Sequence, residues 1–255
     1  MEKSIFNGIV RAPIHTARLP VAAPTRRPAF EERSVINPWG WVKVSGKIGE
    51  QHLQLTDLMV SASQKKIIDE SGRLNLLVDS AVVRAALGWD KINYSQIEDL
   101  LEDMRIAKVE IFVKKMNIKT VGGIVSGYSM ANVEKRAMVK SKHLTTREGD
   151  ENKSRALTPG FWKIIFSENW TALTESDMHY QYRLRSVLAL KNGVSQALAR
   201  FCLSHKSVNE DIISVLHKIG NKRRVDKALD SISYDAEGLS KLGILVERGR
   251  VMMST

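Results

Sequence analysis

The segment Ile219–Ile232 reads IGNKRRVDKALDSI and joins two stretches of helical periodicity. The stretch that ends in it, NEDIISVLHKIG (209–220), predicts a short helix with its apolar side chains turned inward. The stretch that starts in it, RRVDKALDSISYDAEGLSKLG (223–243), predicts a longer helix after a turn. ILVERGRVMMS (244–254) then predicts a β-hairpin built on Gly249. Helix, turn, helix and hairpin in this order are typical of a winged-helix unit.

The same order occurs earlier in the chain. LLVDSAVVRAALGW (76–89) predicts a short helix with Asp79 or Ser80 as its N-cap and Gly88 as its C-cap. YSQIEDLLEDMRIA (94–107) predicts the second helix, and KVEIFVKKMNI (108–118) with GGIVSGYSMANV (122–133) predicts a hairpin. The sequence therefore predicts an α+β fold of two tandem winged-helix domains.

Composition divides the chain into four parts. Residues 1–34 hold most of the prolines among scattered arginines and predict a flexible basic arm. Residues 35–135 are predicted to form the N-terminal winged-helix domain, and the polar stretch 136–154 a linker or mobile loop. Residues 155–255 are predicted to form the C-terminal winged-helix domain, with a long helix from about Glu175 to Ser204.

The charge balance favours a polyanionic partner. There are 39 Lys and Arg against 28 Asp and Glu, a net charge of +11, which favours nucleic acid over a membrane. Cys202 is the only cysteine, so no intramolecular disulfide and no cysteine metal cluster are possible. No signal-peptide core or apolar membrane span is recognisable. We expect a bacterial cytoplasmic protein without cofactor or metal.

The positive charge of the opening segment suits a groove-reading helix. The second helix of a helix-turn-helix enters the major groove with its N-terminal end, so cations there meet phosphates and base edges. A solvated helix face is the alternative interpretation, and Asp226 and Asp230 nearby could orient the arginines or repel phosphate. Arg224 is the favoured base reader, although its angle is close to the packed face. The candidate residues of this unit are Lys222, Arg223, Arg224 and Lys227, with Arg248 and Arg250 at the wing tip.

The first unit offers fewer cations. Its second helix carries the acidic cluster Glu98, Asp99, Glu102 and Asp103, so we expect it to be the weaker reader. Solvation is again the preferred interpretation of the acidic cluster, over a cation site. The candidate DNA contacts are Lys91, Asn93 and Tyr94 at the helix start, and Lys114, Lys115 and Lys119 in the hairpin.

Together these features resemble the Rep initiators of iteron plasmids, particularly the TrfA type. The markers are LGW at 87–89 with Tyr94 soon after, RVDK at 224–227 and AEGLSKLGIL at 236–245. The resemblance implies binding to double-stranded DNA at repeated origin sites, opening of an AT-rich segment, and recruitment of the host initiator and helicase. It also implies dominance of the C-terminal unit, homodimers in equilibrium with monomers, and autorepression. No catalysis is implied.

Two other interpretations stay open. A winged-helix transcriptional regulator or phage-type origin binder without initiator activity has the same visible features. A DNA-nicking enzyme would need paired metal-binding histidines and a tyrosine nucleophile, for which Tyr180 and Tyr182 are the candidates. No phosphate-binding loop of the Walker type is present.

Protein partners are predicted from two short stretches. The apolar strand within 122–133 suits edge-to-edge pairing, which predicts self-association through the N-terminal half. QLTDLM at 54–59 imperfectly matches a sliding-clamp-binding peptide of the form Gln-Leu-x-Leu-Phe. Packing of Leu55 and Leu58 in a helix core is the preferred interpretation.

Overall fold

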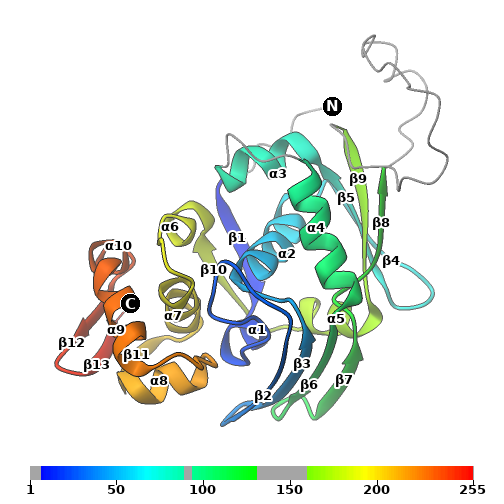
Figure 1. Cartoon of the computed structure of the whole chain (residues 1–255). Helices are drawn as coiled ribbons and strands as arrows, with labels where there is room; N and C mark the ends of the chain where they lie inside the picture. The colour runs from blue at the N-terminus through cyan, green and yellow to red at the C-terminus, as the bar shows by residue number, and fades with distance from the viewer. Residues whose placement is uncertain (1–6, 89–93, 131–159, 255) are drawn as a thin grey trace.

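The computed structural model describes residues 7–88, 94–130 and 160–254 (Figure 1). Two winged-helix units lie side by side, the first on the right of Figure 1 and the second on the left. A further four-stranded sheet lies below the first unit. One continuous set of buried apolar side chains runs through all of these parts.

The first winged-helix unit is built on a four-stranded sheet of order β4-β5-β9-β8. The strand before the helix-turn-helix, β5, pairs with the last strand, β9, and β9 pairs with β8, as in a winged helix. Its elements are α2 (Glu50–Ala62), β4 (Lys65–Ile68), β5 (Leu74–Asp79), α3 (Ser80–Leu87), α4 (Tyr94–Ile106), β8 (Val125–Met130) and β9 (Phe161–Phe166).

The second unit repeats the arrangement with a three-stranded sheet of order β11-β13-β12. The predicted α+β fold with two winged-helix units is thereby confirmed. Its elements are α7 (Gly193–Leu203), β11 (Ser207–Asp211), α8 (Ile212–Lys218), α9 (Val225–Tyr234), α10 (Ala236–Ser240), β12 (Ile244–Glu247) and β13 (Arg250–Ser254).

Local sequence signals set the ends of the short helices. The carboxylate of Asp79 accepts a hydrogen bond from the backbone N–H of Ala81 at 2.8 Å, and Gly88 ends α3 in the left-handed region with φ 64°. Asp211 caps α8 in the same way by accepting from the N–H of Ser214 at 2.8 Å. The predicted caps of the first unit are confirmed.

The predicted hairpin of the first unit is wrong. Strand β6 (Lys108–Val113) pairs with β3 (Gly40–Gly46) and with β7 (Ile118–Gly122), in a second sheet of order β2-β3-β6-β7. The wing is instead β8 with β9, so Phe161–Phe166 belongs to the first unit's sheet and not to the second unit. Gly122 and Gly123 lie where the chain crosses from one sheet to the other. A Cβ on Gly123 would lie 3.0 Å from the Arg105 carbonyl oxygen, so the close approach favours glycine.

The N-terminal segment is not a flexible arm over its described part. Strand β1 (Ile9–Pro13) pairs with β10 (His179–Arg183), and α1 (Ile14–Arg18) follows it. Leu19 and Val21 are fully buried beyond the helix, and β2 (Glu31–Asn37) forms the edge of the second sheet. Apolar side chains along this segment enter the common core, which outweighs the proline-rich composition. Residues 1–6 lie outside the described part, as do residues 136–154 of the predicted linker.

The predicted long helix at 175–204 is also wrong. The segment contains β10, α6 (Leu184–Leu188) and α7, preceded by α5 (Glu168–Thr174). Each winged-helix unit is thus preceded by a strand and a short helix, and the two strands pair with each other. Helix α1 contacts α7 of the second unit, and α6 contacts both α3 of the first unit and α7 of the second.

The first helices of the two units meet at a buried polar seam. The Nε2 of Gln54 on α2 donates to Oε1 of Gln196 on α7 at 3.2 Å. One turn away, the guanidinium of Arg200 on α7 lies 3.3 Å from the Glu50 carboxylate and 3.1 Å from the Asp57 carboxylate, both on α2. Burial raises the pKa of Asp57, and Arg200 opposes this shift. Paired buried charges therefore join the two units.

Candidate nucleic-acid interface

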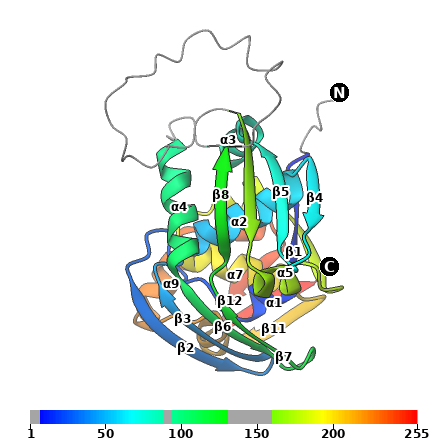
Figure 2. The ribbon, with the colours of Figure 1, turned by 90° about the vertical axis from the view of Figure 1, so that its right-hand side faces the viewer.

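The second helices of the two helix-turn-helix motifs, α4 and α9, face the same side of the molecule. They lie toward the viewer in Figure 1 and along the left-hand side in Figure 2. Strand β4 lies at the opposite, right-hand side of Figure 2. The two helices that are expected to read DNA therefore lie on one side of the molecule.

Helix α9 begins at Val225, one residue after the basic run 222–224. Ala228 and Ile232 are buried beneath it and Leu229 is half-buried, as the pattern predicts. Val225 starts the helix at the surface and is 36% exposed. Lys222, Arg223 and Arg224 therefore lie in the turn that leads into the helix, and Lys227 lies in its first turn.

The cations of this turn are exposed and contact neighbouring acids. Arg224 makes a two-point contact with Asp226, the closest approach being 2.8 Å, and its side chain is 81% exposed. Lys227 lies 3.7 Å from Asp230, with both side chains exposed. Exposed ion pairs of this kind are weak, so a phosphate or base edge can displace the carboxylate.

Lys222 contacts residues of β2, in the first half of the chain. Its Nζ lies 3.3 Å from the Glu31 carboxylate and donates to the carbonyl of Glu32 at 3.2 Å, both on β2. A guanidinium nitrogen of Arg223 lies 3.5 Å from the Thr25 hydroxyl. The turn before α9 is therefore positioned by contacts from the first half of the chain.

The wing of the second unit is a tight two-residue hairpin. Glu247 pairs with Arg250, and Arg248 and Gly249 between them both have positive φ, 50° and 75°. The Ile212 N–H donates to the Gly249 carbonyl at 2.9 Å, which ties the tip to the start of α8. Arg250 donates to the Asn209 side chain at 2.8 Å, whereas Arg248 is exposed at the tip. Both arginines lie at the predicted place.

The first unit presents acids where the second presents cations. Glu102 on α4 accepts from Arg105 at 2.6 Å, which lowers the pKa of the Glu102 carboxyl. Tyr94, a predicted DNA contact, is half-buried. Its ring packs edge-on against Trp162 at a centroid distance of 5.6 Å, so the side chain is used in the core of the first unit. Lys91 and Asn93 lie outside the described residues. That the first unit is the weaker reader stays a prediction.

Lys114, Lys115 and Lys119 do not lie on a wing. Lys114 and Lys115 are exposed in the turn between β6 and β7, and Lys119 is on β7 in the second sheet. The Lys119 ammonium lies 5.6 Å from the ring centroid of Trp41 on β3. The displacement follows from the corrected strand pairing.

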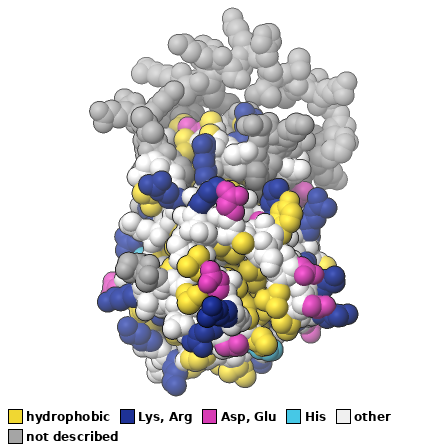
Figure 3. Space-filling view, turned by 90° about the vertical axis from the view of Figure 1, so that its left-hand side faces the viewer, with side chains coloured by type: hydrophobic (Ala, Val, Ile, Leu, Met, Phe, Trp, Pro, Cys, Tyr) yellow, Lys and Arg dark blue, Asp and Glu magenta, His cyan; other side chains and the backbone are white. Residues whose placement is uncertain are grey.

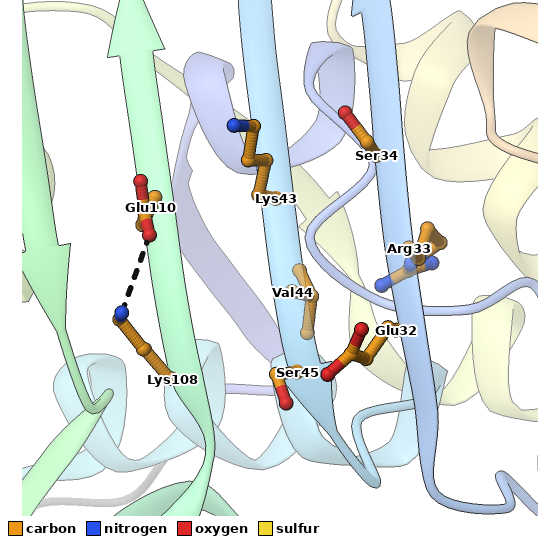
Figure 4. A pocket seen from close by; sticks show the side chains of 8 residues that line it. All are labelled: Glu32, Arg33, Ser34, Lys43, Val44, Ser45, Lys108 and Glu110. Atoms are coloured by element: carbon orange, nitrogen blue, oxygen red, sulfur yellow. Dashed lines mark ion pairs between the residues drawn. The ribbon is translucent and has the colours of Figure 1, made fainter.

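The outer face of this second sheet is hollowed. The hollow holds about 400 Å³, and in Figure 4 Lys108 contacts Glu110, at 3.4 Å, on one of its walls. Side chains of both signs line it, which gives no selectivity for one class of ligand. The lining residues are Glu32, Arg33, Ser34, Lys43, Val44, Ser45, Lys108 and Glu110.

Figure 3 shows the side of the molecule occupied by the second unit. Lys and Arg side chains are spread over this face and alternate with Asp and Glu around an apolar area. Net charge alone therefore does not mark the interface, and the position of each cation relative to α9 and the wing decides its relevance.

The tyrosines considered as nucleophiles are structural. Tyr180 and Tyr182 lie on strand β10, not on a helix, and both are buried. The Tyr182 hydroxyl donates to Asp57 at 2.8 Å, and burial raises the pKa of both phenols. Protonated, inaccessible phenols cannot attack a DNA phosphate.

The sliding-clamp peptide is likewise part of the core. Leu55, Leu58 and Met59 on α2 are fully buried, and Gln54 is buried in the seam. A clamp could bind this segment only after the first unit unfolds. The helix-core interpretation is the one that the structure supports.

Two arginines that composition assigns to the arm lie on the side of α4 and α9. Arg26 and Arg27 belong to the loop that leads into β2, which is drawn in blue, beside the second unit in Figure 1 and at the left-hand side in Figure 2. Sequence reasoning missed their placement. The apolar run Leu19–Ala23 just before them could have indicated an ordered segment, because its apolar side chains are buried in the core.

Known structures share this fold over nearly the whole chain. Domains 2 and 3 of RctB match with a TM-score of 0.59 at 11% identity, over 95% of this chain and 98% of that chain. A second RctB structure, residues 155–483, matches with a TM-score of 0.53 at 9% identity, over 95% and 97%. The Pi initiator protein in complex with iteron DNA matches with a TM-score of 0.53 at 10% identity, over 97% and 96%.

These likenesses confirm the predicted resemblance to replication initiators at the level of the fold. No protein-family model and no curated protein matches the sequence. In the part of the chain that the structure describes, no helix has the length and apolar character needed to span a bilayer.

Proposed function

We propose that the protein is a sequence-specific, double-stranded DNA-binding replication initiator of a plasmid. The observation that carries the proposal is the shared side of α4 and α9, on two winged-helix units joined by a buried seam. One of the structures with this fold is an initiator in complex with iteron DNA, which supports a duplex ligand. The role is binding, with no catalytic residue and no cofactor.

In this proposal the second unit supplies most of the base readout. Arg223 and Arg224 reach base edges from the turn before α9, and Lys222 and Lys227 contact phosphates. Arg248 and Arg250 bind the backbone beside the wing. The first unit adds contacts from the start of α4, where Lys91 and Asn93 are candidates, and Lys114, Lys115 and Lys119 are weaker candidates because they lie on another sheet.

Self-association through the first unit belongs to the same proposal. Strands β4 and β8 are the outer strands of its sheet, and β4 exposes Ile67 and Ile68 by 48% and 52%. Light scattering on the full chain at tens of micromolar should show dimers that Ile67→Lys with Ile68→Lys shifts to monomers. A wild-type chain that is strictly monomeric under these conditions would refute this part.

Initiation is distinguished from plain regulation by what binding does to the DNA. Selection from a randomised duplex pool should first yield a preferred site. Repeats of that site, cloned beside an AT-rich segment in a supercoiled plasmid, should then become permanganate-reactive in the AT-rich segment when the protein is added. Binding without such reactivity would favour the regulator or phage-type origin binder, and nicks formed with Mg²⁺ would favour an enzyme.

Protein partners and autorepression complete the proposal. The host initiator and helicase would bind surfaces outside the DNA-facing side, and repression would follow from binding at the gene's own promoter. Pull-down of purified helicase and a promoter-reporter assay test these two roles separately.

A further inference from the structure

The loop Pro24–Phe30 lies between the two units on their DNA-facing side. It runs from the buried segment after α1 into β2, and in Figure 2 it lies with α4 and α9 along the left-hand side. The backbone of this loop therefore lies on the same side of the molecule as both helices.

Both first helices hold the loop in place. The Ala23 N–H donates to the Ile48 carbonyl at 2.8 Å, and the Glu50 N–H at the start of α2 donates to the Thr25 carbonyl at 3.1 Å. On the other side, a Cβ on Gly193, the first residue of α7, would lie 2.3 Å from the Thr25 Cα. The backbone of Thr25 is thus fixed against the N-terminal ends of both α2 and α7.

The guanidinium groups on this loop are available. Arg27 is exposed and Arg26 is half-exposed. Within residues 7–88, 94–130 and 160–254, no ion pair or side-chain hydrogen bond engages either guanidinium, whereas Arg224 and Lys227 both contact carboxylates. Two arginines that make no ion pair within the described residues therefore lie beside the turn that holds Arg223.

The loop and the turn before α9 are in direct contact. Arg223 reaches the Thr25 hydroxyl at 3.5 Å, and Lys222 reaches Glu31 at the end of the loop at 3.3 Å. Arg26 and Arg27 directly follow Thr25 in the chain, so their backbone lies next to the turn that carries Lys222 and Arg223.

We propose that Arg26 and Arg27 form a third DNA contact, a phosphate clamp on the boundary between the two winged-helix units. The ligand class is the duplex phosphate backbone, and the contact carries no base information. Because Thr25 is fixed to both units, the clamp holds the duplex at one position relative to α4 and α9. This inference rests on the proposed duplex-binding function.

The test is the salt dependence of DNA binding by three full-length proteins. They are the wild type, Arg26→Ala with Arg27→Ala, and a control, Arg73→Ala with Lys163→Ala, that removes the same charge from exposed positions in the turn before β5 and on β9, outside the proposed DNA contacts and the β4 edge. The probe is a fluorescent duplex of random sequence, about three helical turns long, titrated at several salt concentrations. Two lost phosphate contacts should reduce the slope of log affinity against log salt by about 1.8, while the control keeps the wild-type slope.

Two further measurements separate the possible failures. Arg26→Lys with Arg27→Lys should keep the wild-type slope, and circular dichroism should show all variants folded. If the wild type binds with a steep slope and the double-alanine variant binds like the control, the clamp is refuted and the proposed function stands. If the wild type itself binds no duplex, the proposed function fails first.

Discussion

At the scale of single residues, Arg224 is the candidate we favour as the base reader. It is 81% exposed and contacts only Asp226 among the ion pairs described, whereas Arg223 is drawn toward Thr25. We expect Arg224→Ala to cost about 1 to 3 kcal/mol of binding free energy and to relax preference at one base position. Binding selections with each arginine variant against a randomised site would measure both effects.

Two matched variants control this prediction. Arg73→Ala removes an arginine that contacts Asp69 in the turn between β4 and β5, and it should leave binding unchanged. Asp226→Asn should strengthen binding to all sequences, because it removes a carboxylate close to the DNA. Wild-type affinity and preference in folded variants of both Arg223 and Arg224 would mean that this turn is only a solvated surface.

At the scale of elements, close packing of α7 on the loop gives a sharp stability prediction. A Cβ at position 193 would lie 2.3 to 2.6 Å from the backbone of Thr25, so Gly193→Ala must displace the loop or the helix start. We expect a loss of about 1 to 3 kcal/mol in the free energy of unfolding. Urea titration would measure it, with Gly127→Ala as control, since no atom lies within 4 Å of a Cβ there. Equal stability of both variants would contradict the close packing of Gly193 on Thr25.

Helices were easier to predict than strand partners. The 3.6-residue pattern and the caps Asp79 and Gly88 act within a few residues, so α3 and α4 are visible in the sequence. A period of two indicates a strand but not its partner, and the partner of β8 is β9, which begins far along the chain at Phe161. Because the strand partners could not be predicted, Lys114, Lys115 and Lys119 were assigned to a wing on which they do not lie.

At the scale of the whole molecule, the buried seam should make the two units unfold together. Arg200→Met would leave the Glu50 and Asp57 carboxylates buried without their cation, at a cost of about 3 to 5 kcal/mol. We expect one urea transition in the wild type and an earlier, broader one in the variant. Adding Glu50→Gln and Asp57→Asn should recover part of the loss. A variant as stable as the wild type would show that the seam does not join the units.

The composition of residues 1–34 wrongly predicted a flexible arm, because the described part of this segment packs against the rest of the molecule. Prolines and arginines favour disorder when a segment is considered alone. Val10 and Ala12 are buried on β1 because α2 packs against this strand, and β10, from the other half of the chain, pairs with it. The position of Arg26 and Arg27, and with it part of the candidate interface, depends on that long-range pairing and could not be predicted locally.

We propose that the side bearing α4, α9 and the Pro24–Phe30 loop binds duplex DNA through many phosphates. Fluorescence anisotropy of the wild-type protein on its selected duplex, measured between about 50 and 200 mM salt, tests it most directly. If roughly 6 to 10 phosphates are contacted, affinity should fall by about three to five orders of magnitude over this range. Binding that does not change with salt, or no binding to any duplex in the selection, would contradict the account.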